Sequence, residues 1–173
     1  MTYKEYHKIL GLVFASTVVG AIIGYGFFYV FSEQAVFLIE RFKILQSFFG
    51  IYEYEASMSF TYVFMVVFFG NLISTLGYFG LGWLKTAMPV GFITGFFLSV
   101  FLFTGVLRHS TAIPIDVYIL VSVEAAYRVM ALSLGEYLIK NKTRNRLLAG
   151  GVVLAISLLF LFGVFFELYS IFG

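Results

Sequence analysis

The sequence predicts an all-α polytopic membrane protein, a bundle of about five transmembrane helices, and three observations lead to that class. Of its 173 residues, 61% are hydrophobic and 12% are charged, whereas a soluble domain carries about 25% charged residues. Five charge-poor runs each have at least the roughly 20 helical residues that cross a hydrocarbon core of about 30 Å. The basic residues gather mainly between and beside these runs.

The composition excludes several classes of protein. Too few polar side chains are present to cover a water-facing surface, so a soluble globule is excluded. A content of 23 Phe and 12 Tyr excludes a disordered chain. The chain has no cysteine, which excludes disulfides and thiolate metal sites. A net charge of +2 is too small to indicate a nucleic-acid partner.

The first run covers residues 9–31 and contains no charged residue. A signal-peptide core has about 7 to 15 apolar residues, so this longer run is expected to be a retained membrane helix. The segment 33–57 that follows is too charged to cross and too long for a turn. Its apolar side chains alternate with Glu40, Arg41 and Lys43. That pattern is typical of either a short helix lying in the membrane interface or a loop packed over the outer end of the bundle.

Runs 58–84 and 87–107 are separated only by Lys85 and Thr86, a link that predicts an antiparallel helical hairpin. The fourth run, 113–139, is preceded by Ser110 and Thr111 as candidate N-caps and has Pro114 in its first turn. The fifth run covers 147–168. Since the runs fill most of the sequence, residues 1–173 are expected to form a single integral domain of the cell membrane.

The distribution of Lys and Arg predicts the orientation. With the N-terminus in the cytoplasm, seven basic residues fall on the cytoplasmic side and three fall outside, namely Arg41, Lys43 and Arg108. The positive-inside rule favours this arrangement, which places the C-terminus outside. Four of the seven form what we term the basic loop, Lys140, Lys142, Arg144 and Arg146. The basic loop is either a topology determinant or a contact for anionic lipid headgroups or a cytoplasmic partner.

Three polar residues lie near the middle of the membrane. Glu124 and Arg128 are four residues apart on one helical face, a spacing that allows an ion pair. Each such group costs about 2.5–3.5 kcal/mol to insert unless it is paired. Asn71 lies at a similar depth in run 58–84 and could donate to Glu124 and accept from Arg128, with Tyr127 and Ser122 nearby. This cluster is either architectural, fixing helix register, or functional.

Small residues recur at the spacing that lets membrane helices approach closely. They are Ser16, Gly20 and Gly24, then Gly70, Ser74 and Gly77, then Gly91 and Gly95, and finally Gly135. Packing inside one bundle and dimerisation both use such residues. Glu167, near the outer end of the last run, is expected to extend to water, and Asp116 suits the first turn of its helix.

No catalytic pattern emerges from the sequence. His7 and His109 fall on opposite sides of the membrane in this topology, so they cannot share a metal site. Phosphate loops, zinc-protease helices and nucleophile elbows are absent from the sequence. We therefore expect no enzymatic activity, no cofactor and no metal, with the lipid bilayer, a second copy or other membrane proteins as partners.

Three segments resemble the stage II sporulation protein M family of small membrane proteins. The first is the stretch 68–74 around Asn71 with the glycine-rich stretch 77–82. The second runs from Glu124 to Gly135, and the third is the aliphatic stretch 158–167 that ends in Glu167. The resemblance covers roughly residue 64 to the C-terminus. The family's Pro-His-Gly is Ile-Leu-Val at 119–121 here, and its Asn-Gly is replaced around 89–91, so no role of that His is carried over.

What the resemblance implies is a non-enzymatic membrane component that works with partner membrane proteins, with Asn71, Glu124 and Glu167 as the matching positions. The competing class is a small transporter or channel. In that class Glu124 would exchange protons or bind a cation, with Arg128 tuning its charge. The sequence contains no internal repeat of the kind that many transporters use, so a transport pathway would call for an oligomer.

Overall fold

The computed structural model describes residues 2–48, 58–109, 113–140 and 145–173. Within these ranges the chain forms six helices and no strand, which confirms the all-α class. The helices are α1 (Thr2–Val30), α2 (Ser32–Phe48), α3 (Phe60–Trp83), α4 (Ala87–His109), α5 (Ile115–Lys140) and α6 (Arg146–Phe172). The predicted N-caps Ser110 and Thr111 lie outside the described residues.

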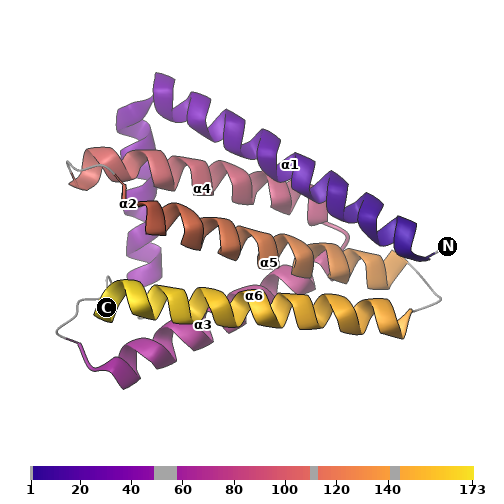
Figure 1. The fold of residues 1–173 in the computed structure, drawn as a ribbon. Coiled ribbons are helices and arrows are strands. Elements are labelled where there is room, and N and C mark those ends of the chain that lie inside the picture. Colours follow the sequence, from indigo (N-terminus) through magenta and orange to yellow (C-terminus); the bar gives the residue numbers. More distant parts are fainter. Residues whose placement is uncertain (1, 49–57, 110–112, 141–144) are drawn as a thin grey trace.

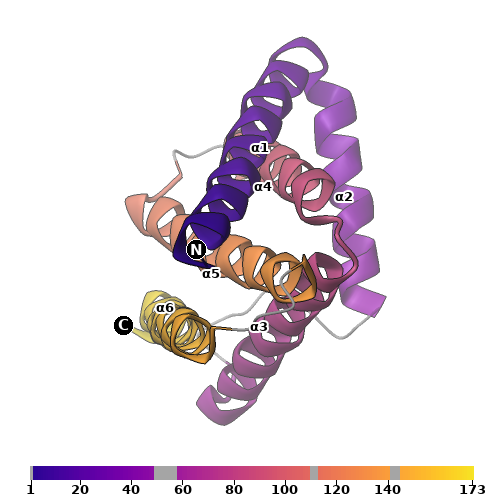
Figure 2. The same cartoon turned by 90° about the vertical axis from the view of Figure 1, so that its right-hand side faces the viewer.

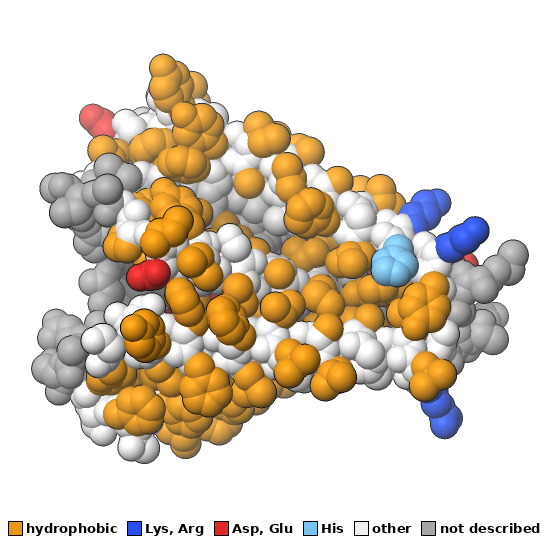
Figure 3. Space-filling model, in the orientation of Figure 1, with side chains coloured by type: hydrophobic (Ala, Val, Ile, Leu, Met, Phe, Trp, Pro, Cys, Tyr) orange, Lys and Arg blue, Asp and Glu red, His pale blue; other side chains and the backbone are white. Residues whose placement is uncertain are grey.

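Five of these helices are long and apolar enough to cross a membrane: α1, α3, α4, α5 and α6. Large apolar side chains cover the flanks of the molecule, while the charged side chains lie toward its two ends (Figure 3). Such a surface suits lipid rather than water. The chain is therefore a multi-pass integral membrane protein. Its α1 begins at Thr2, earlier than the apolar run, because a helix continues beyond the hydrocarbon core when its first turns are polar.

Helix α2 runs crosswise to the other helices (Figure 1) and packs mainly against α4 and α1. Ala35 and Ile39 are buried on one side of it, together with Val100 of α4. Glu40 and Arg41 are exposed on another side, and the Arg41 guanidinium lies 4.9 Å from the centre of the Phe37 ring. Residues 32–48 thus form a transverse helix and not a loop, while the predicted place of this helix in the membrane interface stays a prediction; residues 49–57 lie outside the described part.

Helix α5 occupies the centre of the bundle, in contact with α1, α3, α4 and α6 (Figure 2). Every residue from Ala131 to Tyr137 is buried. The rings of Tyr6 and Tyr137 meet edge to face at 5.8 Å, which ties the start of α1 to the second half of α5. A helix surrounded by four others can hold polar side chains at low cost, because those side chains can face protein instead of lipid.

Helices α1 and α4 run parallel and meet through reciprocal glycines. A Cβ at Gly20 would collide with the carbonyl oxygen of Phe92, and a Cβ at Gly95 would collide with that of Thr17. The glycine of each helix thus lies against the backbone carbonyl that precedes the glycine of the other helix by three residues. Gly24 and Gly91, also predicted as packing residues, lie in the same contact. Close backbone approach of this kind supplies the van der Waals contact that holds membrane helices together.

The same arrangement joins α3 to α5, but with a glycine that the sequence pattern missed. A Cβ at Gly82 would collide with the carbonyl oxygen of Leu132, and a Cβ at Gly135 would collide with that of Phe79. Gly70 and Gly77, also predicted to permit close approach, make no such contact within this chain, since a Cβ at either would meet no atom within 4 Å. The face of α3 toward α5 follows buried residues 71, 75 and 82, and Gly70 and Gly77 lie beside that face; Ser74 is half-buried.

The link between α3 and α4 turns through Lys85, whose φ of 62° is left-handed. The two helices of this predicted hairpin touch little. A hydroxyl pair, Tyr78 and Thr94 at 2.9 Å, nevertheless connects them. Each helix instead packs mainly on a parallel partner, α3 on α5 and α4 on α1, because the glycines that allow close contact face those partners.

Candidate functional site

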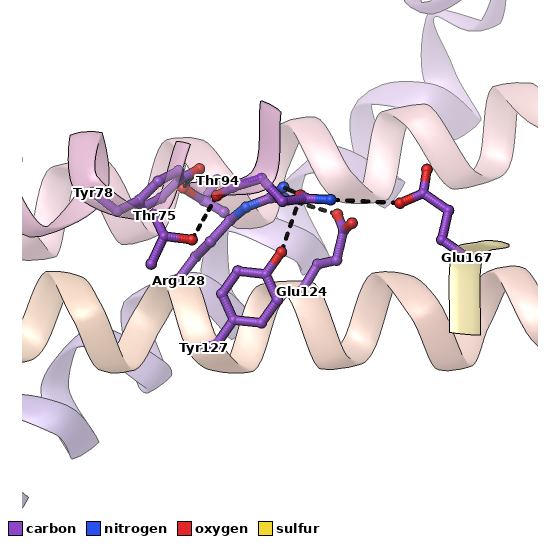
Figure 4. Close-up of polar contacts among 8 residues, drawn as sticks. Thr75, Tyr78, Thr94, Glu124, Tyr127, Arg128 and Glu167 are labelled. Carbon is purple, nitrogen blue, oxygen red and sulfur yellow. Dashed lines mark hydrogen bonds and ion pairs between the residues drawn. The ribbon is translucent and has the colours of Figure 1, made fainter. Parts of the chain in front are cut away.

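The candidate site is a polar cluster between α3, α5 and α6 that includes Glu124, Arg128 and Glu167 (Figure 4). Asn71 of α3 is its hub, because it is hydrogen-bonded to residues of both α5 and α6. Arg128 Nη2 donates to Asn71 Oδ1 at 2.8 Å, and the Tyr127 hydroxyl donates to the same oxygen at 3.0 Å. Asn71 is 9% exposed and Tyr127 is 1% exposed. One amide oxygen in the interior of the bundle thus receives two hydrogen bonds, one of them from a charged donor.

Glu124 and Arg128 form the ion pair that their spacing allows. Arg128 Nη1 lies 3.0 Å from Glu124 Oε2, one helical turn away on α5. Both side chains are about five-sixths buried, with 16% of each exposed. The guanidinium also lies 5.6 Å from the centre of the Tyr127 ring. Pairing within one helix lets both charges enter the membrane together, and this lowers the cost of each.

Glu167 of α6 belongs to the same cluster. Asn71 Nδ2 donates to Glu167 Oε2 at 3.4 Å, a long hydrogen bond between two residues that are 96 positions apart in the sequence. The sequence instead led us to expect that this amide would donate to Glu124 and that Glu167 would extend to water. The difference arises because Arg128 already engages Glu124, while Glu167 is half-buried beside α3.

Two features of the cluster bear on its chemistry. It contains two carboxylates, Glu124 and Glu167, and one guanidinium, which pairs with Glu124, so the fully ionised cluster carries a net negative charge. The Nε of Arg128 is buried and has no hydrogen-bond partner within the described structure. The Thr75 hydroxyl donates to the backbone carbonyl of Asn71 at 2.7 Å, so this hydrogen bond stays within α3. The cluster is therefore largely but not completely paired.

Other predicted site residues lie elsewhere. Ser122 is exposed and donates to the Tyr118 carbonyl at 2.7 Å, away from the cluster. Ser16 of α1 donates to the Met88 carbonyl of α4 at 2.8 Å, which adds a hydrogen bond to the α1–α4 contact. Of the basic loop, Lys140 ends α5 and Arg146 begins α6, while Lys142 and Arg144 lie outside the described residues.

No sequence pattern indicated that Glu136 is a buried polar residue. It is 5% exposed, forms an ion pair with Lys140, and accepts a hydrogen bond from the Ala87 backbone N–H at 3.1 Å. Ala87 is the first residue of α4, so this carboxylate satisfies an orphan donor at a helix N-terminus. Only the Glu–Lys spacing of four residues hinted at the ion pair; the contact with α4 depends on the fold.

No group of three or more His, Asp or Glu side chains that could hold a metal occurs in the part of the chain that the structure describes. The carboxylates, guanidinium and amide of the cluster can form ion pairs and hydrogen bonds, and its carboxylates can bind protons. Comparison of the chain with protein-family models, with curated proteins and with solved structures finds no match.

Proposed function

We propose that this protein is a non-enzymatic component of the membrane, similar to stage II sporulation protein M, that acts by assembling with a second copy or with another membrane protein. The observation that supports this is that each buried or half-buried carboxylate in the described part of the chain has a polar partner within the chain. Glu124 pairs with Arg128, Glu167 with Asn71, and Glu136 with Lys140 and the start of α4. Groups that are engaged within one chain need no bound ion to offset the cost of placing them in the membrane, and this favours a structural role over transport.

The proposal includes an orientation with the N-terminus in the cytoplasm. Basic side chains gather at the end of the molecule where the chain begins (Figure 3). Helices α3 and α5 end there, and α4 and α6 begin there (Figure 1). Lys4, Lys8, Lys85, Lys140 and Arg146 therefore share that end, which the positive-inside rule places in the cytoplasm. The C-terminus then lies on the outer side.

Cross-linking in native membranes tests the assembly. A photoreactive residue at Phe37, which is 56% exposed on the transverse helix α2, samples contacts made in the plane of the interface. We expect a discrete cross-linked species in which the partner and this protein occur in a fixed ratio. A matched probe at Leu154, which is 62% exposed on α6, reports contacts on the opposite flank. Adducts with lipid alone at both positions would contradict the assembly.

A second candidate function, proton- or cation-coupled transport, is favoured by one observation, the excess carboxylate of the cluster. Proteoliposomes that contain a pH-sensitive dye distinguish the two functions. A scaffold gives the same proton flux as empty vesicles, and so does its Glu124→Gln variant. A flux that requires the protein and is lost on Glu124→Gln or Glu167→Gln would replace the scaffold by the transporter.

A further inference from the structure

A groove lies between α1 and α5, on a side of α5 that does not carry the polar cluster. Its volume is about 570 Å³. Its walls are apolar, and His7 lies at one end while Thr17 and Ser122 lie at the other. The side chains that form the walls are Leu10, Gly11, Phe14, Ala125, Ala126 and Met130.

The groove exists because small residues face each other across it. Val13 and Leu132 are fully buried where α1 and α5 touch. Beside that contact, Gly11 and the pair Ala125–Ala126 leave the space unfilled, and a Cβ built on Gly11 would meet no atom within 4 Å. The hollow is thus a fixed product of side-chain size on two packed helices.

The length of the groove matches one leaflet of a bilayer. From His7 to Thr17 the groove follows α1 for ten residues, which is about 15 Å at about 1.5 Å per residue. This is half of a hydrocarbon core of about 30 Å. A transmembrane helix of a partner would need the full thickness, so a groove of this length fits an acyl chain that enters from one side.

The open end of the groove is basic. Lys4 lies three residues before His7, one turn further along the same face of α1, and Lys8 follows His7 directly; both lysines are exposed. Glu5 is the acidic neighbour in this turn. Lys85, Lys140 and Arg146 lie toward the same end of the molecule, where α3 and α5 end and α4 and α6 begin (Figure 1). A lipid phosphate at this end of the groove would lie near two lysines and a histidine, and near one carboxylate, that of Glu5.

We propose that the groove binds one anionic phospholipid from the leaflet at the N-terminal end of the bundle. One acyl chain fills the space beside Gly11, and the phosphate lies at His7 between Lys4 and Lys8. The apolar walls supply chain burial and the basic end supplies selection by headgroup charge. This site is separate from the polar cluster and holds whether the protein is a scaffold or a transporter.

Fluorescence quenching by brominated lipids tests the site on the full chain. The single tryptophan, Trp83, is replaced by Phe, and Phe14 on the groove wall is replaced by Trp. Quenching is measured in phosphatidylcholine vesicles that contain brominated phosphatidylglycerol, and again with brominated phosphatidylcholine. We expect phosphatidylglycerol to be preferred about five- to thirty-fold, as two nearby lysines predict.

Matched variants separate the site from its surroundings. Lys4→Gln with Lys8→Gln should reduce the preference to nearly one, whereas Lys85→Gln with Arg146→Gln, which removes equal charge at the same end, should leave it unchanged. Gly11→Leu should fill the groove and reduce quenching by both lipids. Gly26→Leu on the same helix, also in open space, should not. Equal quenching by the two lipids, or equal effects of the two double variants, would overturn the proposal.

Discussion

Replacing Asn71 by Leu removes the hub of the polar cluster with little change in side-chain volume. The Arg128 and Tyr127 donors lose a shared acceptor at 2.8 Å and 3.0 Å, and Glu167 loses a donor at 3.4 Å. Interhelical hydrogen bonds in membranes contribute about 0.6 kcal/mol on average and up to about 1.7 kcal/mol. A bond to a charged group in a protein contributes about 1.5–3 kcal/mol.

Taking the Arg128 bond at about 1.5–2 kcal/mol, the Tyr127 bond at about 0.6–1 kcal/mol and the long Glu167 bond as minor, Asn71→Leu should lower the free energy of unfolding by about 2–3 kcal/mol. Reversible unfolding in bicelles, followed by steric trapping, measures this directly. The control is Thr75→Val on the next turn, which removes only a hydroxyl bonded along its own helix. That change should cost less than about 0.5 kcal/mol.

A double-mutant cycle between Asn71→Leu and Arg128→Met isolates the strongest bond of the cluster. We expect a coupling free energy of about 1–2 kcal/mol between the two residues. If Asn71→Leu costs no more than Thr75→Val, or if the coupling is zero, then the amide does not hold α3 to α5 and the cluster has no architectural role.

Three further predictions concern other contacts. Gly95→Leu should prevent stable folding, because its side chain meets the α1 backbone, whereas Gly70→Leu should leave the melting temperature in detergent within a few degrees of wild type. Glu136→Ala should lower the free energy of unfolding by about 1–3 kcal/mol, because the backbone N–H at the start of α4 loses its acceptor. Glu136→Gln keeps an acceptor and should cost less. Chemical unfolding of both variants measures the difference. A cysteine at Lys85 should react with an impermeant maleimide only after permeabilisation, and one at Asp116 should react in intact cells; the reverse pattern would contradict the orientation.

The membrane helices could be predicted because hydropathy alone sets their length and depth. The same depth argument placed Asn71 level with Glu124 and Arg128, and the structure brings all three together. The place of Glu167 in the cluster was not predicted, because its position near the end of the helix suggested that its side chain reaches water. Its actual contact with Asn71 depends on how α6 lies against α3. Gly82 escaped as well, because a sequence shows that a residue is small but not which face it occupies.

The reciprocal glycine contacts imply a delay between the synthesis of a helix and its packing on its partner. Helix α1 has its parallel partner in α4, which is synthesised after α2 and α3, and helix α3 has its partner in α5, which is synthesised after α4. At about 5–20 residues per second, α1 waits several seconds in the membrane before the segment carrying Gly91 and Gly95 leaves the ribosome. The exposed stripe of Ser16, Gly20 and Gly24 is open to insertion factors and quality-control proteases during that interval, and the arrival of α4 closes it.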